Sequence, residues 1–336
     1  MPTKQRAAAL DWLLEAADPG PRYLALRDLL GAGRDDAELR AARRAAHQAG
    51  PIAAVLDHME PAGFWVKPGS GYNPKYRSTV WALTLLAQLG ASVDEDPRLA
   101  AACDYVLTHT RAPGGQFTSL TNGSPSGTID CLQGNLSWAL LALGCVDERL
   151  AAAFEWMARS VTGEGVGAVG DRAAEVRYYG YKCGPTFACS ANGRLPCAWG
   201  GTKVMLAFGL LPRAQRTPLV KRAIAHGAEF LLNGHPETAS YPIGSGTKPS
   251  RSWFKFGFPV FYVTDVVQVV AALGQLGYGR DPRLAAAQAL VRDQQDNQGR
   301  WALEYDYAGK TWADFGPKHQ ANKWVTLRAL TALSLA

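Results

Sequence analysis

The stretch AQALVRDQQDNQGRW, residues 287–301, joins a helical pattern to a glycine turn that ends in tryptophan. Two weaker copies of this turn are present, EPAGFW ending at Trp65 and APGGQF ending at Phe117. Glycine allows a tight turn, and the aromatic ring that follows it can pack back on the helix ends. The recurring unit predicts a chain built from helix pairs that are joined by such turns.

One class of predicted helix follows an acidic turn. The segments DPRLAAACDYVLTHT, DERLAAAFEWMARSV and DPRLAAAQALVRDQQ begin at Asp96, Asp147 and Asp281. Each opens with Asp as an N-cap and then places apolar residues at helical spacing among exposed charges, which is typical of an outer helix. Further outer helices are expected at residues 5–16, 35–59 and 217–234.

A second class of predicted helix alternates with the first and is apolar nearly all round. Its members begin at Arg22, Thr79, Asn135, Trp199, Phe258 and Lys323. Helices of this kind must be buried on every side, so six short-range pairs with the apolar helix inside describe a closed ring. We therefore expect an all-α fold, an (α/α)6 toroid of six outer/inner helix pairs around a central cavity. It forms one domain over residues 1–336, and an open solenoid is the alternative.

The stretch 287–301 resembles the QW repeat of the terpenoid cyclase and protein prenyltransferase toroid superfamily, in which Gln and Trp tie an outer helix to its connector. The turns that end at Trp65 and Phe117 extend this resemblance over most of the chain. The whole sequence looks like a bacterial squalene-cyclase-like or prenyltransferase-like protein. The resemblance implies the toroid fold and directs attention to isoprenoid or similar apolar substrates.

The catalytic motifs of that superfamily are not matched. The nearest string to DxDD is DEDP at residues 94–97, which we interpret as a helix cap, and no DDxxD motif is present. Protein prenyltransferases place zinc on an Asp, a Cys two residues later and a distant His. Asp130 and Cys131 are adjacent here, so that site does not transfer residue by residue.

Four of the six cysteines are expected to converge. Cys131 and Cys197 stand just before the third and fourth inner helices, while Cys183 and Cys189 lie in the connector leading to Cys197. Because a chain without a secretory signal argues against a disulfide framework, these thiols suggest a metal site. Thiolates at helix N-termini bind soft metals, and zinc is the candidate cofactor. Free thiols in a structured loop are the alternative.

An aromatic run enters the fifth inner helix, and a cavity lined by such residues would hold an apolar ligand or stabilise a cation. The predicted substrate-binding residues are Tyr76, Lys75, Trp199, Trp253, Phe254, Phe258, His319 and Trp324. The predicted catalytic residues are Asp265, Asp130 and Tyr262. Asp265 stands on an apolar helix, where a carboxylate is either a general acid or the partner of a buried cation.

Together these features favour an enzyme that acts on an apolar or isoprenoid small molecule by cyclisation, isomerisation or transfer. The alternative is a non-catalytic toroid that binds a ligand or peptide and contains a structural metal. The two are distinguished by whether the metal has an open coordination position. An α/α-barrel carbohydrate enzyme ranks last, because it would need two carboxylates in the cavity.

Composition agrees with a globular chain, since 47% of the 336 residues are hydrophobic and 19% are charged. The net charge is +6, but the basic residues are spread along the chain, which argues against a nucleic-acid partner. The first residues, MPTKQRAAALDWLLEA, indicate a helix instead of a signal peptide, and Asp265 interrupts the longest apolar run. We expect a cytoplasmic protein without a transmembrane segment.

Overall fold

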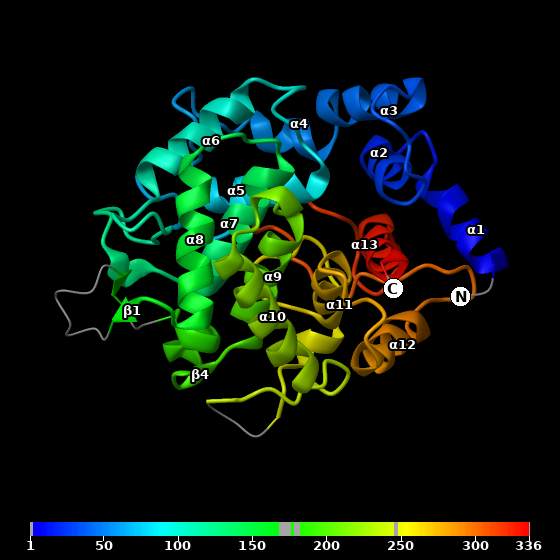
Figure 1. Ribbon diagram of the computed structural model, residues 1–336. Helices are drawn as coiled ribbons and strands as arrows, with labels where there is room; N and C mark the ends of the chain where they lie inside the picture. The colour runs from blue at the N-terminus through cyan, green and yellow to red at the C-terminus, as the bar shows by residue number, and fades with distance from the viewer. Residues whose placement is uncertain (1–2, 168–175, 178–181, 245–247, 336) are drawn as a thin grey trace.

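Helices follow one another around a ring in the computed structural model, which describes residues 3–167, 176–177, 182–244 and 248–335 (Figure 1). The inner helices are α2 (Pro19–Asp28), α5 (Thr79–Leu89), α7 (Asp130–Ala142), α9 (Ala198–Leu210), α11 (Val266–Gln275) and α13 (Lys323–Ser334). Nearly every residue of α5 is buried, as its apolar sequence requires. The same holds for most of α9 and α11.

Contacts between successive inner helices close the ring. Helix α5 packs on α7, α7 on α9, α9 on α11, α11 on α13, and α13 on α2. Gly90 ends α5 with φ 82°, and a methyl group at this position would lie 2.7 Å from Leu24 of α2. The glycine therefore allows the left-handed cap and the close approach that joins α5 to α2.

The outer helices surround this ring (Figure 1). They are α1 (Thr3–Leu13), α3 (Ala37–Gln48) with α4 (Pro51–Leu56), α6 (Arg98–His109), α8 (Arg149–Thr162), α10 (Pro218–Asn233) and α12 (Ala285–Asp293). Each packs an apolar face inward, as Leu150, Phe154 and Met157 of α8 illustrate. The N-terminal α1 contacts the C-terminal α13, so the two ends of the chain meet. The predicted all-α toroid of six outer/inner helix pairs is confirmed.

Strands and short helices lie only in connectors within the described ranges. The strands are β1 (Val166–Gly167) paired with β2 (Val176–Arg177), and β3 (Ala188–Cys189) paired with β4 (Leu195–Pro196). The 3-10 helices are η1 (Pro125–Gly127), η2 (Pro185–Phe187), η3 (Ser190–Asn192), η4 (Arg213–Gln215), η5 (Arg251–Phe254) and η6 (Pro282–Leu284). Part of the long connector between α8 and α9 lies outside the described residues.

Three predicted boundaries were wrong. The outer helix at 35–59 is divided in two, because Gly50 takes φ 79° and Pro51 begins a new helix. The third inner helix begins at Asp130, so Cys131 lies within its first turn. The fifth inner helix begins at Val266 instead of Phe258, since Asp265 caps it by accepting a hydrogen bond from the Gln268 N–H.

The aromatic residue of each glycine turn ties the helices of a pair together. The Trp301 indole N–H donates to Val291 O of α12 (2.7 Å), and its backbone N–H donates to Thr326 Oγ1 of α13 (2.9 Å). Trp65 repeats both bonds, to Val55 O of α4 (2.8 Å) and Thr79 Oγ1 of α5 (3.1 Å). We call this arrangement the connector tie.

Phe117 makes the backbone half of the same tie. Its N–H donates to Gln133 Oε1 of α7 (2.8 Å), and Gln133 Nε2 donates back to Phe117 O (2.6 Å). Phe117, Trp65 and Trp301 are all at most 1% exposed. A buried backbone N–H must find a partner, so the tie fixes where each of these inner helices starts.

Replacing Trp301 with Phe should lower the free energy of unfolding by about 1–3 kcal/mol, because the buried Val291 carbonyl loses its donor. Denaturant unfolding measures the change. Val146→Ala provides a control, since Val146 is 99% exposed and its replacement should have little effect. A Trp301→Phe protein as stable as the wild type would contradict the tie.

Candidate functional site

A cavity of about 550 Å³ lies inside the ring and is lined by all six inner helices. Its walls are mostly apolar and include Leu24, Trp138, Leu206, Ala271 and Leu327. The lining residues run from the middle of most of these helices to their C-terminal ends, and the rim residues Arg27, Asp28 and Leu210 are exposed. The cavity therefore opens where the inner helices end. The seven helical steps from Lys203 to Leu210 of α9 rise about 10 Å, which is the depth of the cavity along this helix.

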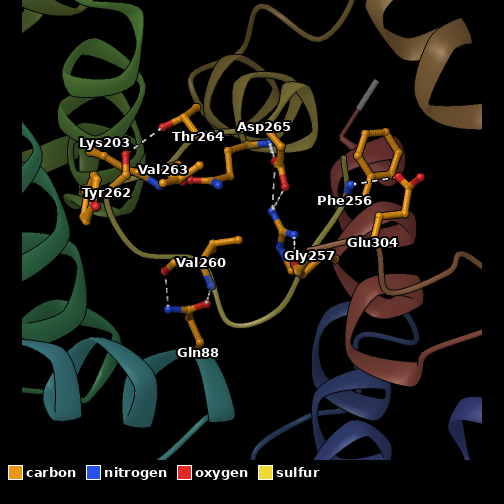
Figure 2. Close-up of polar contacts among 12 residues, drawn as sticks. Gln88, Lys203, Phe256, Gly257, Val260, Tyr262, Val263, Thr264, Asp265 and Glu304 are labelled. Atoms are coloured by element: carbon orange, nitrogen blue, oxygen red, sulfur yellow. Dashed lines mark hydrogen bonds and ion pairs between the residues drawn. The ribbon is translucent and has the colours of Figure 1, made fainter. Parts of the chain in front are cut away.

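The segment before α11 crosses the ring and forms the floor of this cavity. Val260 exchanges two hydrogen bonds with Gln88 of α5, each 2.8 Å long (Figure 2). Arg328 of α13 donates to Gly257 O, and Phe258 lines the cavity beside Val260. Phe258 and Val260 thus lie at the floor, and residues 258–265 are not the first turns of a helix.

Asp265 is engaged in an ion pair. Arg328 Nη2 donates to both carboxylate oxygens at 3.0 Å, and Asp265 Oδ1 also accepts the Gln268 N–H at 3.0 Å (Figure 2). The Asp265 side chain is 4% exposed and that of Arg328 is 15% exposed. This arrangement matches the paired alternative for Asp265, and the carboxylate does not line the large cavity.

Lys203 is the residue at the floor whose chemistry stands out. It is 1% exposed, lines the cavity, and donates to Gln268 Oε1 and to Val263 O (3.4 Å). Among the described residues, it forms no ion pair with a carboxylate. Burial lowers the pKa of Lys203 to about 7, and the Arg328 cation adds to this shift, while Asp265 and Cys131 oppose it. Its amine is therefore partly neutral near pH 7.

Four predicted residues form an aromatic cluster at the opposite end of the ring. The Tyr76 hydroxyl donates to the Tyr262 hydroxyl at 3.0 Å, and Lys75 Nζ lies 4.6 Å from the Tyr262 ring centre. The Trp199 ring lies 6.4 Å from the Tyr262 ring. Burial raises the pKa of Tyr76, and its bond to Tyr262 adds to the effect. This cluster stands at the starts of α5 and α9, away from the lining of the large cavity.

The other predicted binding residues lie in different places. Phe258 lines the cavity and stacks on Trp324, with ring centres 4.8 Å apart. The Trp253 indole N–H donates to Pro236 O (2.8 Å). Trp253 and its neighbour Phe254 belong to η5 and are not among the residues that line the cavity. His319 is exposed on the loop before α13. Of the eight predicted substrate-binding residues, Phe258 alone is among the described residues that line the cavity.

Asp130 and the predicted cysteines gather where α7 and α9 begin. A methyl group on Gly200 would lie 2.9 Å from Asp130 Cβ, which shows how close the two helix starts are. Burial raises the pKa of the Asp130 carboxyl well above its usual value, and Cys189 adds to the shift. Among the residues that the structure describes, its buried Oδ2 atom has no hydrogen-bond partner.

The thiols affect one another's ionisation. Hydrogen bonding from Cys197 lowers the pKa of Cys189 to about 6, and burial raises the pKa of Cys131 to about 12. Burial also raises the pKa of Cys183. Within the part of the chain that the structure describes, however, no group of three or more His, Cys, Asp or Glu side chains is arranged to hold a metal ion. Zinc binding by these cysteines stays a prediction.

Comparison with known proteins does not identify a family for this chain. No family model matches the chain, and no curated protein matches it. A similar solved structure is the type II terpene cyclase MstE from Scytonema, a variant in complex with its product merosterolic acid A. It is 14% identical, the match covers 88% of this chain and 96% of that one, and the TM-score is 0.33. A likeness this weak carries no argument about the site. No helix in the described ranges is long and apolar enough to cross a membrane.

Sequence reasoning missed Lys203 as a site residue. The signal was a single lysine in the helix AWGGTKVMLAFGL, which is otherwise apolar or small. A buried amine at the floor of a large cavity is the chemical feature most typical of a functional site in this protein.

Lys203→Met should change how stability depends on pH. The pKa of Lys203 is lowered to about 7 in the folded state, from 10.5. Between these values the unfolded chain binds more protons, so the wild type gains stability as pH rises, by up to about 1.4 kcal/mol per pH unit. The variant lacks this gain. Urea unfolding between pH 6 and 10 measures the difference, and a difference that stays constant with pH would contradict the buried-amine interpretation.

Asp265→Asn should destabilise the fold by about 3–5 kcal/mol, because it leaves the Arg328 guanidinium without its partner charge. Asn can still cap α11, so the change isolates the charge. The double variant Asp265→Asn/Arg328→Met should recover much of the loss. Equal stability of the single variant and the wild type would show that the ion pair contributes nothing.

Proposed function

We propose that this protein is an enzyme that binds an isoprenoid or similar apolar molecule in its central cavity and acts on the polar end of that molecule. The observation that carries the proposal is a cavity with aliphatic walls and a polar floor. Its volume of about 550 Å³ is in the range of small-molecule sites. Leu24, Leu206 and Leu327 suit a hydrocarbon chain, which gains free energy by leaving water.

The floor supplies the polar groups. Asn135 of α7, Lys203 of α9 and Gln268 of α11 line the same cavity, and each is at least about nine-tenths buried. A ligand that places its chain against the walls brings its polar head to these residues. Lys203 is the one among them whose protonation changes near neutral pH, so we assign it the chemical role.

The proposed reaction class is cyclisation, isomerisation or transfer on an apolar skeleton. Asp265, Asp130 and Tyr262 do not line this cavity in the described structure. Asp265 contributes by holding Arg328 at the floor, where the guanidinium also reaches Gly257 O. It acts as a positioning residue in this scheme.

Calorimetric titration with farnesol and with farnesoic acid tests the cavity. Ala271 lines the wall, so Ala271→Trp should fill the space and weaken binding at least tenfold. Ala151→Trp is the matched control, since Ala151 is exposed on α8 and its replacement should leave binding unchanged. Thermal melts verify that both variants fold. Absence of binding to the wild type, or equal binding by Ala271→Trp, would overturn the proposal.

Product analysis after incubation with prenyl compounds separates an enzyme from a binding protein. Product that forms with the wild type and disappears with Lys203→Met supports catalysis. Binding without any product supports the non-catalytic alternative.

A further inference from the structure

We propose that Lys203 is a covalent catalytic residue whose amine condenses with the carbonyl carbon of an apolar aldehyde or ketone held in the central cavity. This proposal rests on the proposed function, because it uses the same cavity. It adds the substrate class, a carbonyl compound, and the bond that forms.

The first support is the position of Lys203. Its side chain emerges from the middle of α9, is 1% exposed, and borders the floor of a cavity whose walls are aliphatic. An apolar carbonyl compound that enters from the rim along walls about 10 Å deep would bring its head to this amine. Because Lys203 is 1% exposed, bulk water has little access to it, which favours the condensed product over its hydrolysis.

The second support is the number of hydrogen-bond acceptors. A neutral amine has two N–H donors and one lone pair, whereas an ammonium ion has three N–H donors and no lone pair. In the described structure Nζ has two acceptors, Gln268 Oε1 and Val263 O. They satisfy both hydrogens of the neutral amine and leave its lone pair free to attack.

The third support is the electrostatic surroundings. Arg328 also lines the cavity, and its positive charge disfavours a second cation nearby. Asp265 favours the ammonium ion, but it is bound to Arg328 through both carboxylate oxygens, and burial of Lys203 has the larger effect. A lysine that is desolvated and close to another cation is the arrangement that makes an amine nucleophilic near neutral pH.

Lys323 shows the contrast within the same ring. It is also on an inner helix and only 9% exposed, yet its Nζ lies 2.7 Å from Glu15 Oε2 and 2.6 Å from Asp18 Oδ2. Two carboxylates therefore bind that amine, whereas Lys203 has amide and carbonyl partners. Lys323 is therefore a matched control for Lys203.

The condensation needs no redox partner. The lone pair of the neutral Lys203 amine attacks the carbonyl carbon, and the C=O bond becomes C–OH as a proton moves from nitrogen to oxygen. Loss of water then breaks the C–O bond and forms C=N. Nitrogen gives up both of its hydrogens overall, and the carbonyl oxygen leaves as water.

Reductive trapping tests the proposal on the full chain. The wild type is incubated with farnesal and sodium cyanoborohydride, which converts an imine into a stable secondary amine, and the modified residue is located by peptide mass spectrometry. We expect the adduct at Lys203, none at Lys323, and at least a tenfold loss of adduct in Lys203→Met and in Lys203→Arg. Excess farnesol should suppress the adduct by competing for the cavity.

The pH dependence separates covalent attack from simple binding of an anionic head. Trapping should accelerate as pH rises toward the pKa of Lys203, about 7, and then level off, because the neutral amine reacts. A floor that bound farnesoic acid through the Lys203 ammonium would instead lose affinity over the same pH range. Trapping that slows as pH rises would overturn the proposal.

Two failures remain distinguishable. If farnesol binds in the cavity but farnesal leaves Lys203 unmodified, the covalent step is wrong and the proposed cavity function stands. If neither compound binds, both are wrong. Adducts spread over exposed lysines at the same rate in Lys203→Met would also overturn the covalent role.

Discussion

The connector tie is the interaction on which the ring depends. A chain that leaves an outer helix must turn tightly and bury an aromatic residue, and the backbone N–H of that residue has no helical partner. Thr79, Gln133 and Thr326 accept this hydrogen at the starts of three inner helices. The tie thus converts a local turn into a fixed distance between an outer and an inner helix. It is present at three helix pairs, where it fixes how the outer helix stands against the start of the inner one.

Glycine determines how closely two of the inner helices meet beside the site. A methyl group on Gly134 of α7 would lie 2.2 Å from the carbonyl carbon of Lys203 on α9. Helix α7 therefore packs directly against the backbone of α9 at this level. The backbone of Lys203 is held by this contact while Gln268 and Val263 hold its amine, so the residue is restrained at both ends.

Periodicity in the sequence was enough to predict the architecture, because six apolar helices alternating with amphipathic ones can be buried only by mutual packing. Periodicity was not enough to predict the structure of the segment that begins at Phe258, which is not helical before Val266. An apolar run has the same sequence pattern whether it forms a helix or an extended segment. In this chain the Asp265 cap determines where the extended segment ends and α11 begins. Aromatic residues were likewise expected in the cavity. A sequence does not show at which end of a ring such residues lie. Tyr76 and Tyr262 lie at the end opposite the opening.

The inner helices all direct their C-terminal ends toward the rim of the cavity. Each helix carries a partial negative charge of about half an elementary charge at that end. The entrance is therefore encircled by carbonyl oxygens, and the field of these aligned dipoles opposes the positive net charge of the chain as a whole. The same rim carries the Arg27 guanidinium, so the helix ends and this side chain act on an approaching anion with opposite signs. The direction in which the helices run thus sets the sign of the backbone's contribution to the field at the entrance.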